Sequence, residues 1–152
     1  GRFASSNRKE RGEGKPDSFD FLGFTHSCGK SGKGGFMIRR KTIAKRMTAK
    51  LKVVKEELRK RMHDPLGKTG HWLAGVIRGA TNYYAVPGNM KAVRAFYTQV
   101  GRLWLKAIRH RSQKAKQRWT WERFYRLQGY WLPRPRLCHP YPSQRFDAMY
   151  SR

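Results

Sequence analysis

Residues 70–112 read GHWLAGVIRGATNYYAVPGNMKAVRAFYTQVGRLWLKAIRHRS, and this stretch predicts two amphipathic helices. Apolar side chains recur every three or four positions on each side of a Pro-Gly-Asn break, which is the spacing of one face of an α-helix. Pro87 should end the first helix because proline disfavours helical geometry in the residue before it. Asn89 is expected to cap the second helix by accepting its free backbone amides. Helices over about 69–85 and 89–112 are therefore predicted, with a core that contains Trp72, Leu73, Val76, Met90, Phe96, Leu103 and Trp104.

The flanking segments extend this pattern to a mainly α fold. A third helix is predicted over about 42–62, with Thr42 as its N-cap. Upstream, Phe19–Thr25 and Phe36–Arg39 predict the strands of a small β-hairpin joined by a glycine-rich turn. Downstream, TWERFYRLQGYW at residues 120–131 predicts a short helix capped by Thr120, and the four prolines that follow Leu132 predict an extended C-terminal strap.

Three parts are expected along the chain. Residues 1–40 carry the hairpin, residues 41–115 the three-helix bundle, and residues 116–152 the short helix and the proline-rich tail. A chain of 152 residues with 38% hydrophobic side chains is large enough to bury one core.

Positive charge dominates the composition. The sequence has 35 Lys and Arg against 9 Asp and Glu, a formal net charge of +26, and no acidic residue between Pro65 and Trp121. Such a charge opposes folding unless an anionic partner neutralises it, and nucleic acid is the usual partner. A membrane surface is the competing partner, but it is disfavoured because the basic residues alternate with a core-like stripe and form no short exposed amphipathic helix.

The predicted nucleic-acid contacts combine cations with an aromatic ring. Arg78, Asn82 and Tyr83 fall near the polar side of one helix, where a guanidinium can hold phosphate and an aromatic face can stack on a base. Core packing is the alternative for the two tyrosines; it is preferred for Tyr84 and left open for Tyr83. The full set of predicted RNA contacts is Lys45, Arg46, Lys50, Arg78, Asn82, Tyr83, Arg102, Arg109, Arg111 and Lys114.

The sequence predicts no catalytic residue, metal or cofactor in this chain. Glu56 and Glu57 are adjacent, but neighbours on a helix point about 100° apart and cannot share one metal well. The segment CGKSGKGG lacks the GxxxxGK[ST] order of a phosphate loop and is interpreted as a turn. His26, Cys28, Cys138 and His139 lack zinc-ligand spacing. Two distant cysteines and the absence of a long apolar run predict a cytoplasmic protein that does not enter a membrane.

Several blocks of the sequence resemble, in the same order, the C-terminal part of group II intron reverse transcriptases. FDFLGFTH at residues 19–26 is similar to the last strand block of their palm, and RGATNYYAVPGN at residues 78–89 resembles the signature of their thumb, the maturase-specific domain. RLW at residues 102–104, HRSQ at residues 110–113 and LCHPYP at residues 137–142 continue the resemblance.

The resemblance implies a three-helix thumb that grips intron RNA and the RNA/DNA template–primer, assists splicing, and works with polymerase palm and fingers. The Tyr-Ala-Asp-Asp metal-binding motif does not occur in this sequence. Mg²⁺ and RNA-directed DNA polymerase activity are therefore expected of a parent protein or partner and not of the chain alone. Three alternatives stay open: a general structured-RNA-binding protein, a subunit that completes a separately encoded reverse transcriptase, and a decayed remnant.

Overall fold

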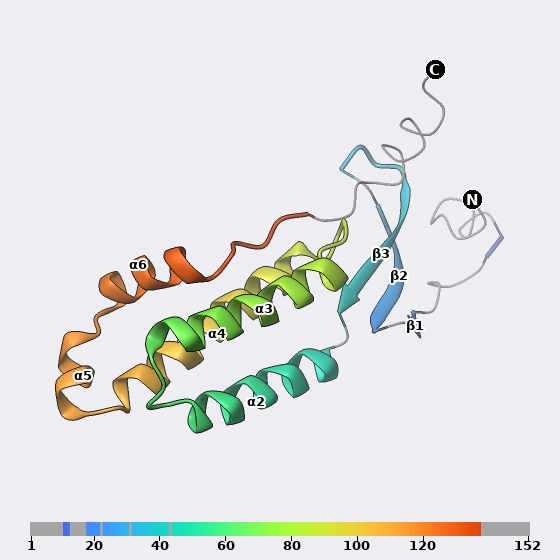
Figure 1. Cartoon of the computed structure of the whole chain (residues 1–152). Helices are drawn as coiled ribbons and strands as arrows, with labels where there is room; N and C mark the ends of the chain where they lie inside the picture. The colour runs from blue at the N-terminus through green and yellow to red at the C-terminus, as the bar shows by residue number, and fades with distance from the viewer. Residues whose placement is uncertain (1–10, 13–17, 22, 31, 43, 138–152) are drawn as a thin grey trace, which may run out of the picture.

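A computed structural model describes residues 11–12, 18–21, 23–30, 32–42 and 44–137 of the chain. Its strands are β1 (Phe19–Phe21), β2 (Phe24–Lys30) and β3 (Phe36–Thr42). Its helices are α2 (Ala44–Lys60), α3 (Leu66–Tyr84), α4 (Met90–Arg109), α5 (Gln113–Arg118) and α6 (Trp121–Trp131) (Figure 1). The prediction of a mainly helical fold that begins with a small antiparallel hairpin is confirmed.

The three strands form one antiparallel sheet in the order β1-β2-β3. The predicted pairing was wrong in detail, because the strand expected over Phe19–Thr25 is divided by a turn at Gly23 and β1 pairs with β2. Gly23 has a φ of 82°, a left-handed conformation that glycine adopts without a steric penalty. The hairpin proper joins β2 to β3, with Phe24 opposite Thr42 and Lys30 opposite Phe36. Residues 27–30, expected in the turn, therefore belong to β2, where backbone pairing outweighs their turn-like composition.

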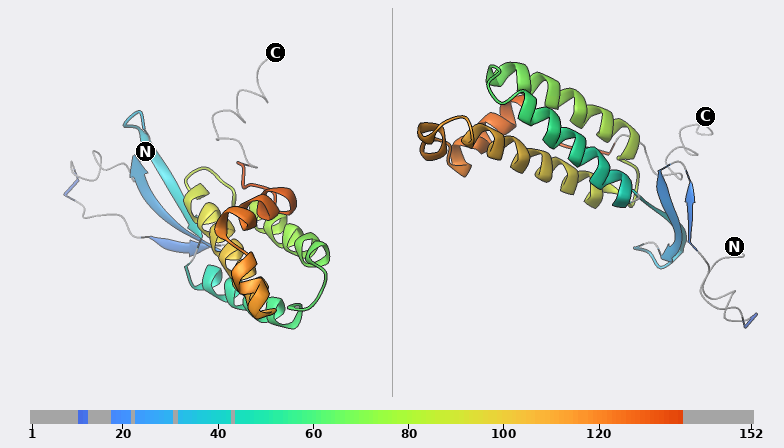
Figure 2. Two further views of the ribbon diagram at one scale, coloured as in Figure 1. Left: turned by 90° about the vertical axis from the view of Figure 1, so that its left-hand side faces the viewer. Right: turned by 90° about the horizontal axis from the view of Figure 1, so that it is seen from below.

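Helix α4 is the centre of the bundle. It contacts α2, α3 and α5, while α6 packs on α3. In Figure 1, α2 and α6 lie on opposite sides of the α3–α4 pair. Figure 2 shows the sheet projecting from one end of the bundle, with α5 at the other end.

The apolar stripe of α4 fills the core. Its buried members are Val93, Phe96, Val100, Trp104, Leu105 and Ile108, and they meet Leu73 and Ile77 of α3, Val54 and Leu58 of α2 and Phe124 of α6. Leu73, Phe96 and Trp104 are almost fully buried, as predicted. Trp72, Val76, Met90 and Leu103 are partly buried at the edge of this core. The Arg61 guanidinium lies 4.8 Å from the centre of the Trp72 ring, within the range of a cation–π interaction.

Helix α6 approaches α3 and α4 closely because glycines face it. A Cβ atom on Gly70 of α3 would lie 2.7 Å from Cγ of Trp131, and one on Gly101 of α4 would lie 2.5 Å from Nε2 of Gln128. Phe124, one turn before Gln128 on α6, packs edge-on against Trp104 with ring centres 5.7 Å apart. Aromatic side chains of α6 thus complete a core that the three longer helices leave open on one side.

Two residues that were predicted to cap helices have other roles in the structure. Thr42 does not cap α2; it is the last residue of β3, and α2 begins at Ala44. Asn89 precedes α4 but its side chain makes no capping bond. Its buried amide instead accepts a hydrogen bond from the Thr42 backbone N at 2.8 Å and donates to Thr42 Oγ1 at 2.6 Å and to the Tyr84 carbonyl at 2.9 Å. These bonds tie the sheet to the α3–α4 connection.

The C-terminal part contains one more helix than predicted. Ser112 caps α5 by accepting from the Ala115 amide at 3.1 Å, and no helix was predicted over these residues. Thr120 caps α6, as predicted, by accepting from the Arg123 amide at 3.3 Å. Residues 133–137 have no regular secondary structure, and the rest of the predicted strap lies outside the described residues.

Candidate nucleic-acid interface

The predicted RNA contacts fall into two groups at opposite ends of the bundle. The sheet-end group consists of Lys45, Arg46 and Lys50 on α2 with Arg78, Asn82 and Tyr83 on α3. The α5-end group consists of Arg102 and Arg109 on α4, Arg111 after it, and Lys114 on α5. Helix α4 has 20 residues, so about 30 Å of helix separates its two ends. The predicted contacts therefore lie on two surfaces, one at each end of the bundle.

An aromatic cluster lies beneath the sheet-end group. The rings of Phe24 and Tyr83 are stacked, with centres 5.9 Å apart and planes 15° apart. Tyr84 meets Tyr83 edge-on at 4.7 Å and Phe24 at 5.3 Å. Tyr84 is 4% exposed, which confirms its predicted place in the core, whereas Tyr83 is 50% exposed. Tyr83 thus packs on the cluster while it presents much of its surface to solvent.

The turn at Gly23 brings cations of α2 to this cluster. Lys50 Nζ lies 5.2 Å from the centre of the Tyr84 ring, within the range of a cation–π interaction. A Cβ atom on Gly23 would lie 3.6 Å from Cδ of Arg46 and 3.7 Å from Cε1 of Tyr83. Arg46 and Lys50 are four residues apart and share one face of α2. The structure therefore assembles Arg46, Lys50 and Tyr83, which are distant in sequence, around one turn.

The remaining members of the sheet-end group extend the charged surface along α2 and α3. Arg78 and Asn82 are exposed one helical turn apart on α3, and Lys45 is exposed next to Arg46 on α2. Among the side chains that the structure describes, the ion pairs lie away from this group: Glu57 pairs with Arg61 at 3.0 Å and Asp64 with Lys68 at 3.9 Å, both near the α2–α3 connection. The sheet-end surface is accordingly basic in the structure as well as in the sequence.

At the α5 end, two of the predicted arginines bind backbone carbonyls. Arg109 Nε donates to the Trp119 carbonyl at 2.8 Å, which joins the end of α4 to the linker before α6. Arg111 Nη2 donates to the Asp64 carbonyl, which joins the residues after α4 to the α2–α3 connection. Both arginines are half-buried, whereas Arg102 and Lys114 are exposed. Arg109 and Arg111 thus have structural bonds that the charge pattern did not indicate, and their contact with RNA stays a prediction.

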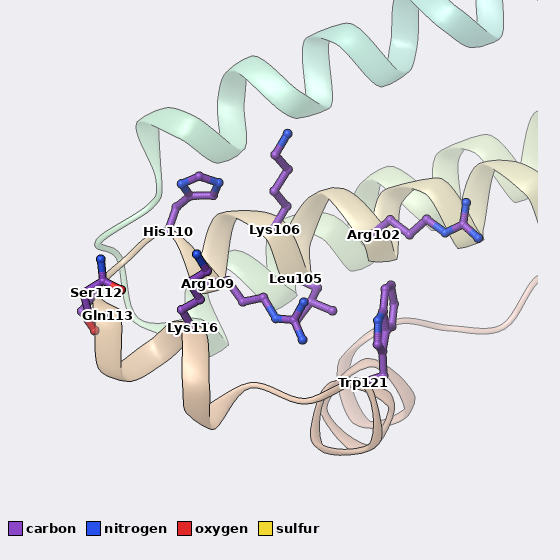
Figure 3. A pocket seen from close by; sticks show the side chains of 9 residues that line it. All are labelled: Arg102, Leu105, Lys106, Arg109, His110, Ser112, Gln113, Lys116 and Trp121. Carbon is purple, nitrogen blue, oxygen red and sulfur yellow. The ribbon is translucent and has the colours of Figure 1, made fainter.

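A groove at the α5 end contains residues outside the predicted set. It has a volume of about 820 Å³ and is lined by Arg102, Leu105, Lys106, Arg109, His110, Ser112, Gln113, Lys116 and Trp121 (Figure 3). Lys106 follows Arg102 by four residues and precedes Arg109 by three, so helical spacing places all three near one face of α4. The sequence spacing could therefore have identified Lys106 as a member of the α5-end group. No local pattern places Trp121 beside Arg102, because the two come from different helices.

One tyrosine of α4 has a shifted pKa. Burial raises the pKa of the Tyr97 phenol above its usual value of 10.0, and the positive charge of Arg134 lowers it in part. Arg134 follows α6, so this interaction places the residues after α6 near α4.

The described part of the chain offers no group of His, Cys, Asp and Glu side chains that could hold a metal ion. His26 and Cys28 lie on β2, whereas Cys138 and His139 lie outside the described residues. Among the described helices, none has the length and apolar content that crossing a bilayer requires.

Searches for related proteins returned no match among protein-family models, curated proteins or solved structures. The resemblance to group II intron reverse transcriptases therefore rests on the quoted sequence blocks, and the function it implies is carried forward as a proposal.

Proposed function

We propose that this chain binds structured RNA as the thumb, or maturase-specific domain, of a group II intron reverse transcriptase. In that role it helps the intron to splice and holds the RNA/DNA template–primer. The observation that carries the proposal is the sheet-end surface, where Arg46 and Lys50 lie beside the half-exposed ring of Tyr83. The resemblance of residues 78–89 to the thumb signature supports the assignment to this family.

The chemistry of that surface suits a folded RNA. Double-stranded RNA is recognised mostly through phosphates, 2′-hydroxyls and shape, and unpaired bases through stacking on aromatic rings. Exposed cations on α2 and α3 supply phosphate contacts, and each contact releases counterions from the RNA. Tyr83 supplies a ring that is held in place by Phe24 behind it. The partners proposed are group II intron RNA, the template–primer, and the palm and fingers that would supply Mg²⁺-dependent polymerisation.

A salt titration of RNA binding tests the proposal. The full chain is titrated by fluorescence anisotropy with a group II intron RNA and with an unrelated structured RNA of the same length. The logarithm of the affinity should fall linearly with the logarithm of the salt concentration, because binding is driven by counterion release. The double variant Arg46→Gln/Lys50→Gln should reduce that slope by about 1–2, because each of the two side chains would no longer neutralise a phosphate.

A matched control removes the same charge from another side of α2. Lys52 and Lys55 are exposed, and the helical step of about 100° per residue turns them away from Arg46 and Lys50. The Lys52→Gln/Lys55→Gln variant should keep a slope close to that of the wild type. Equal slopes for the two double variants would contradict a site at the sheet end. Equal affinity for the two RNAs would identify a general structured-RNA-binding protein instead.

A further inference from the structure

We propose that the groove between α4, α5 and the start of α6 binds unpaired nucleotides of a single-stranded nucleic acid, with Trp121 as the stacking surface. This inference rests on the proposed function, because the ligand is again nucleic acid. It assigns a second site with a different ligand, at the end of the bundle opposite the sheet.

The groove at Trp121 opens on both sides of the ring. One side is the hollow of about 820 Å³ between α4 and α5, shown in Figure 3. The other side is a hollow of about 360 Å³ along α6 that reaches Tyr125. Arg102 and Trp121 line both hollows, so the two hollows are adjacent at these residues. Volumes of this size are typical of sites for small organic ligands.

The Trp121 ring packs against two neighbouring aromatic rings, and much of the residue is still exposed to solvent. Its ring packs edge-on against the buried Phe124, with centres 6.3 Å apart and planes 85° apart. It lies beside the Tyr125 ring, with centres 5.8 Å apart and planes tilted by 36°. Trp121 is still 42% exposed and Tyr125 is 60% exposed. Neighbouring exposed aromatic side chains mark an interaction site, because water contact with their apolar surface is unfavourable.

Positive charge borders the rings on the side of α4 and α5. Arg102 and Lys116 line the hollow from the two helices, and Figure 3 shows the Arg109 guanidinium between α4 and the linker before Trp121. The Arg109 bond to the Trp119 carbonyl fixes that linker and with it the position of the indole. None of the described residues that line either hollow is acidic. A phosphate inside either hollow would therefore meet only positive or neutral lining residues, and the acidic residue next in sequence to Trp121, Glu122, lies outside both linings.

The combination of rings and cations selects a single strand over other anions. Non-specific single-strand sites pair a basic groove with aromatic rings on which bases stack, and any base can stack. The bases of a continuous duplex already stack on one another and leave the rings unused. An acidic peptide would neutralise the cations but would gain little from the exposed indole.

Binding of a short oligonucleotide tests the site directly. The probe is a fluorescein-labelled oligouridylate of about eight nucleotides, too weakly structured to form a duplex, added to the full chain at moderate salt. Trp121→Ala should weaken its binding at least about fivefold, the lower limit for removal of one base–aromatic stack. Trp121→Phe keeps a ring and should retain most of the affinity.

The control for this experiment is on the same helix. Tyr130 is 79% exposed on α6 and does not line either hollow, so Tyr130→Ala should bind the oligonucleotide like the wild type. Equal binding by Trp121→Ala and Tyr130→Ala would overturn the proposal. A second outcome would also overturn it. If polyglutamate, added at the same concentration of charge as the oligonucleotide, displaces the oligonucleotide from the wild type and binds more weakly to Trp121→Ala, the groove is a site for an acidic peptide.

Each of the two proposed sites can be contradicted without contradicting the other. Arg46→Gln/Lys50→Gln should leave oligouridylate binding unchanged, and Trp121→Ala should leave the salt slope for structured RNA unchanged. If Arg46→Gln/Lys50→Gln does not change the salt slope, the sheet-end site is contradicted and the groove is not. If Trp121→Ala does not change oligouridylate binding, the groove is contradicted and the sheet-end site is not.

Discussion

The two ends of the bundle use positive charge in different ways. At the sheet end, Lys50 lies against the ring of Tyr84 and Arg46 against the turn at Gly23. At the α5 end, Arg109 and Arg111 donate to backbone carbonyls of connecting segments. One acid-free stretch of sequence, residues 65–121, supplies the arginines of the α5 end and part of the sheet-end group. Equal charge in the sequence therefore does not mean equal availability to a ligand.

The two ends are also stabilised by different kinds of interaction. The sheet end depends on a buried polar contact, since Asn89 connects Thr42 and Tyr84 by three hydrogen bonds. The other end depends on aromatic packing, since Trp104, Phe124 and Trp131 fill the space around α6. Substitutions that separate hydrogen bonding from packing should therefore have different costs at the two ends.

The largest effect is expected in the aromatic packing. Trp104 is 1% exposed and packs against Phe124, so Trp104→Ala should lower the free energy of unfolding by about 3–5 kcal/mol by leaving a cavity. Chemical denaturation measures the change. Trp121→Ala is the control, because this tryptophan is exposed and its removal should change the unfolding free energy far less. Near-wild-type stability of Trp104→Ala would contradict the assignment of the core to this face of α4.

A smaller effect is expected at the sheet end. Asn89→Ala removes the side-chain partner of the part-buried Thr42 amide and one of two donors to the Tyr84 carbonyl, which also accepts from the Val86 amide at 2.8 Å, so it should cost about 2 kcal/mol. Thr42→Val removes only the hydroxyl acceptor, so its cost should be about 1 kcal/mol. Denaturation of both variants, with amide exchange of β3 as a local readout, distinguishes the two. Equal costs would mean that the hydroxyl, and not the backbone contacts, holds the sheet.

The smallest effect comes from one substitution made at two glycines of α3. Gly70→Ala places a methyl group against Trp131 and should destabilise the chain by about 1–2 kcal/mol through overpacking of α6. Gly75 has open space around it, so Gly75→Ala should stabilise the chain by about 0.5–1 kcal/mol through helix propensity. Thermal melting of the pair measures both signs. If both variants were stabilised, α6 would not be packed on Gly70.

Part of the site is accessible from sequence because it depends on local spacing. The periodicity of α3 places Tyr84 in the core and Arg78 with Asn82 on one exposed face, and the position of Thr120 before an apolar pattern identifies it as a cap. Local spacing does not reveal Trp121 as part of a groove or the carbonyl bonds of Arg109 and Arg111, because each depends on a residue of another element.

The sequence by itself determined the helices other than α5, their apolar faces and the sign of the surface charge. These features follow from a spacing of about 3.6 residues per turn and from composition, which are local properties of a chain. Only the tertiary structure decided that Asn89 binds Thr42 instead of capping α4, that Gly23 divides the first strand, and that the cations form two surfaces. Each of these depends on atoms brought together from distant positions, and such contacts exist only after the helices and the sheet have packed.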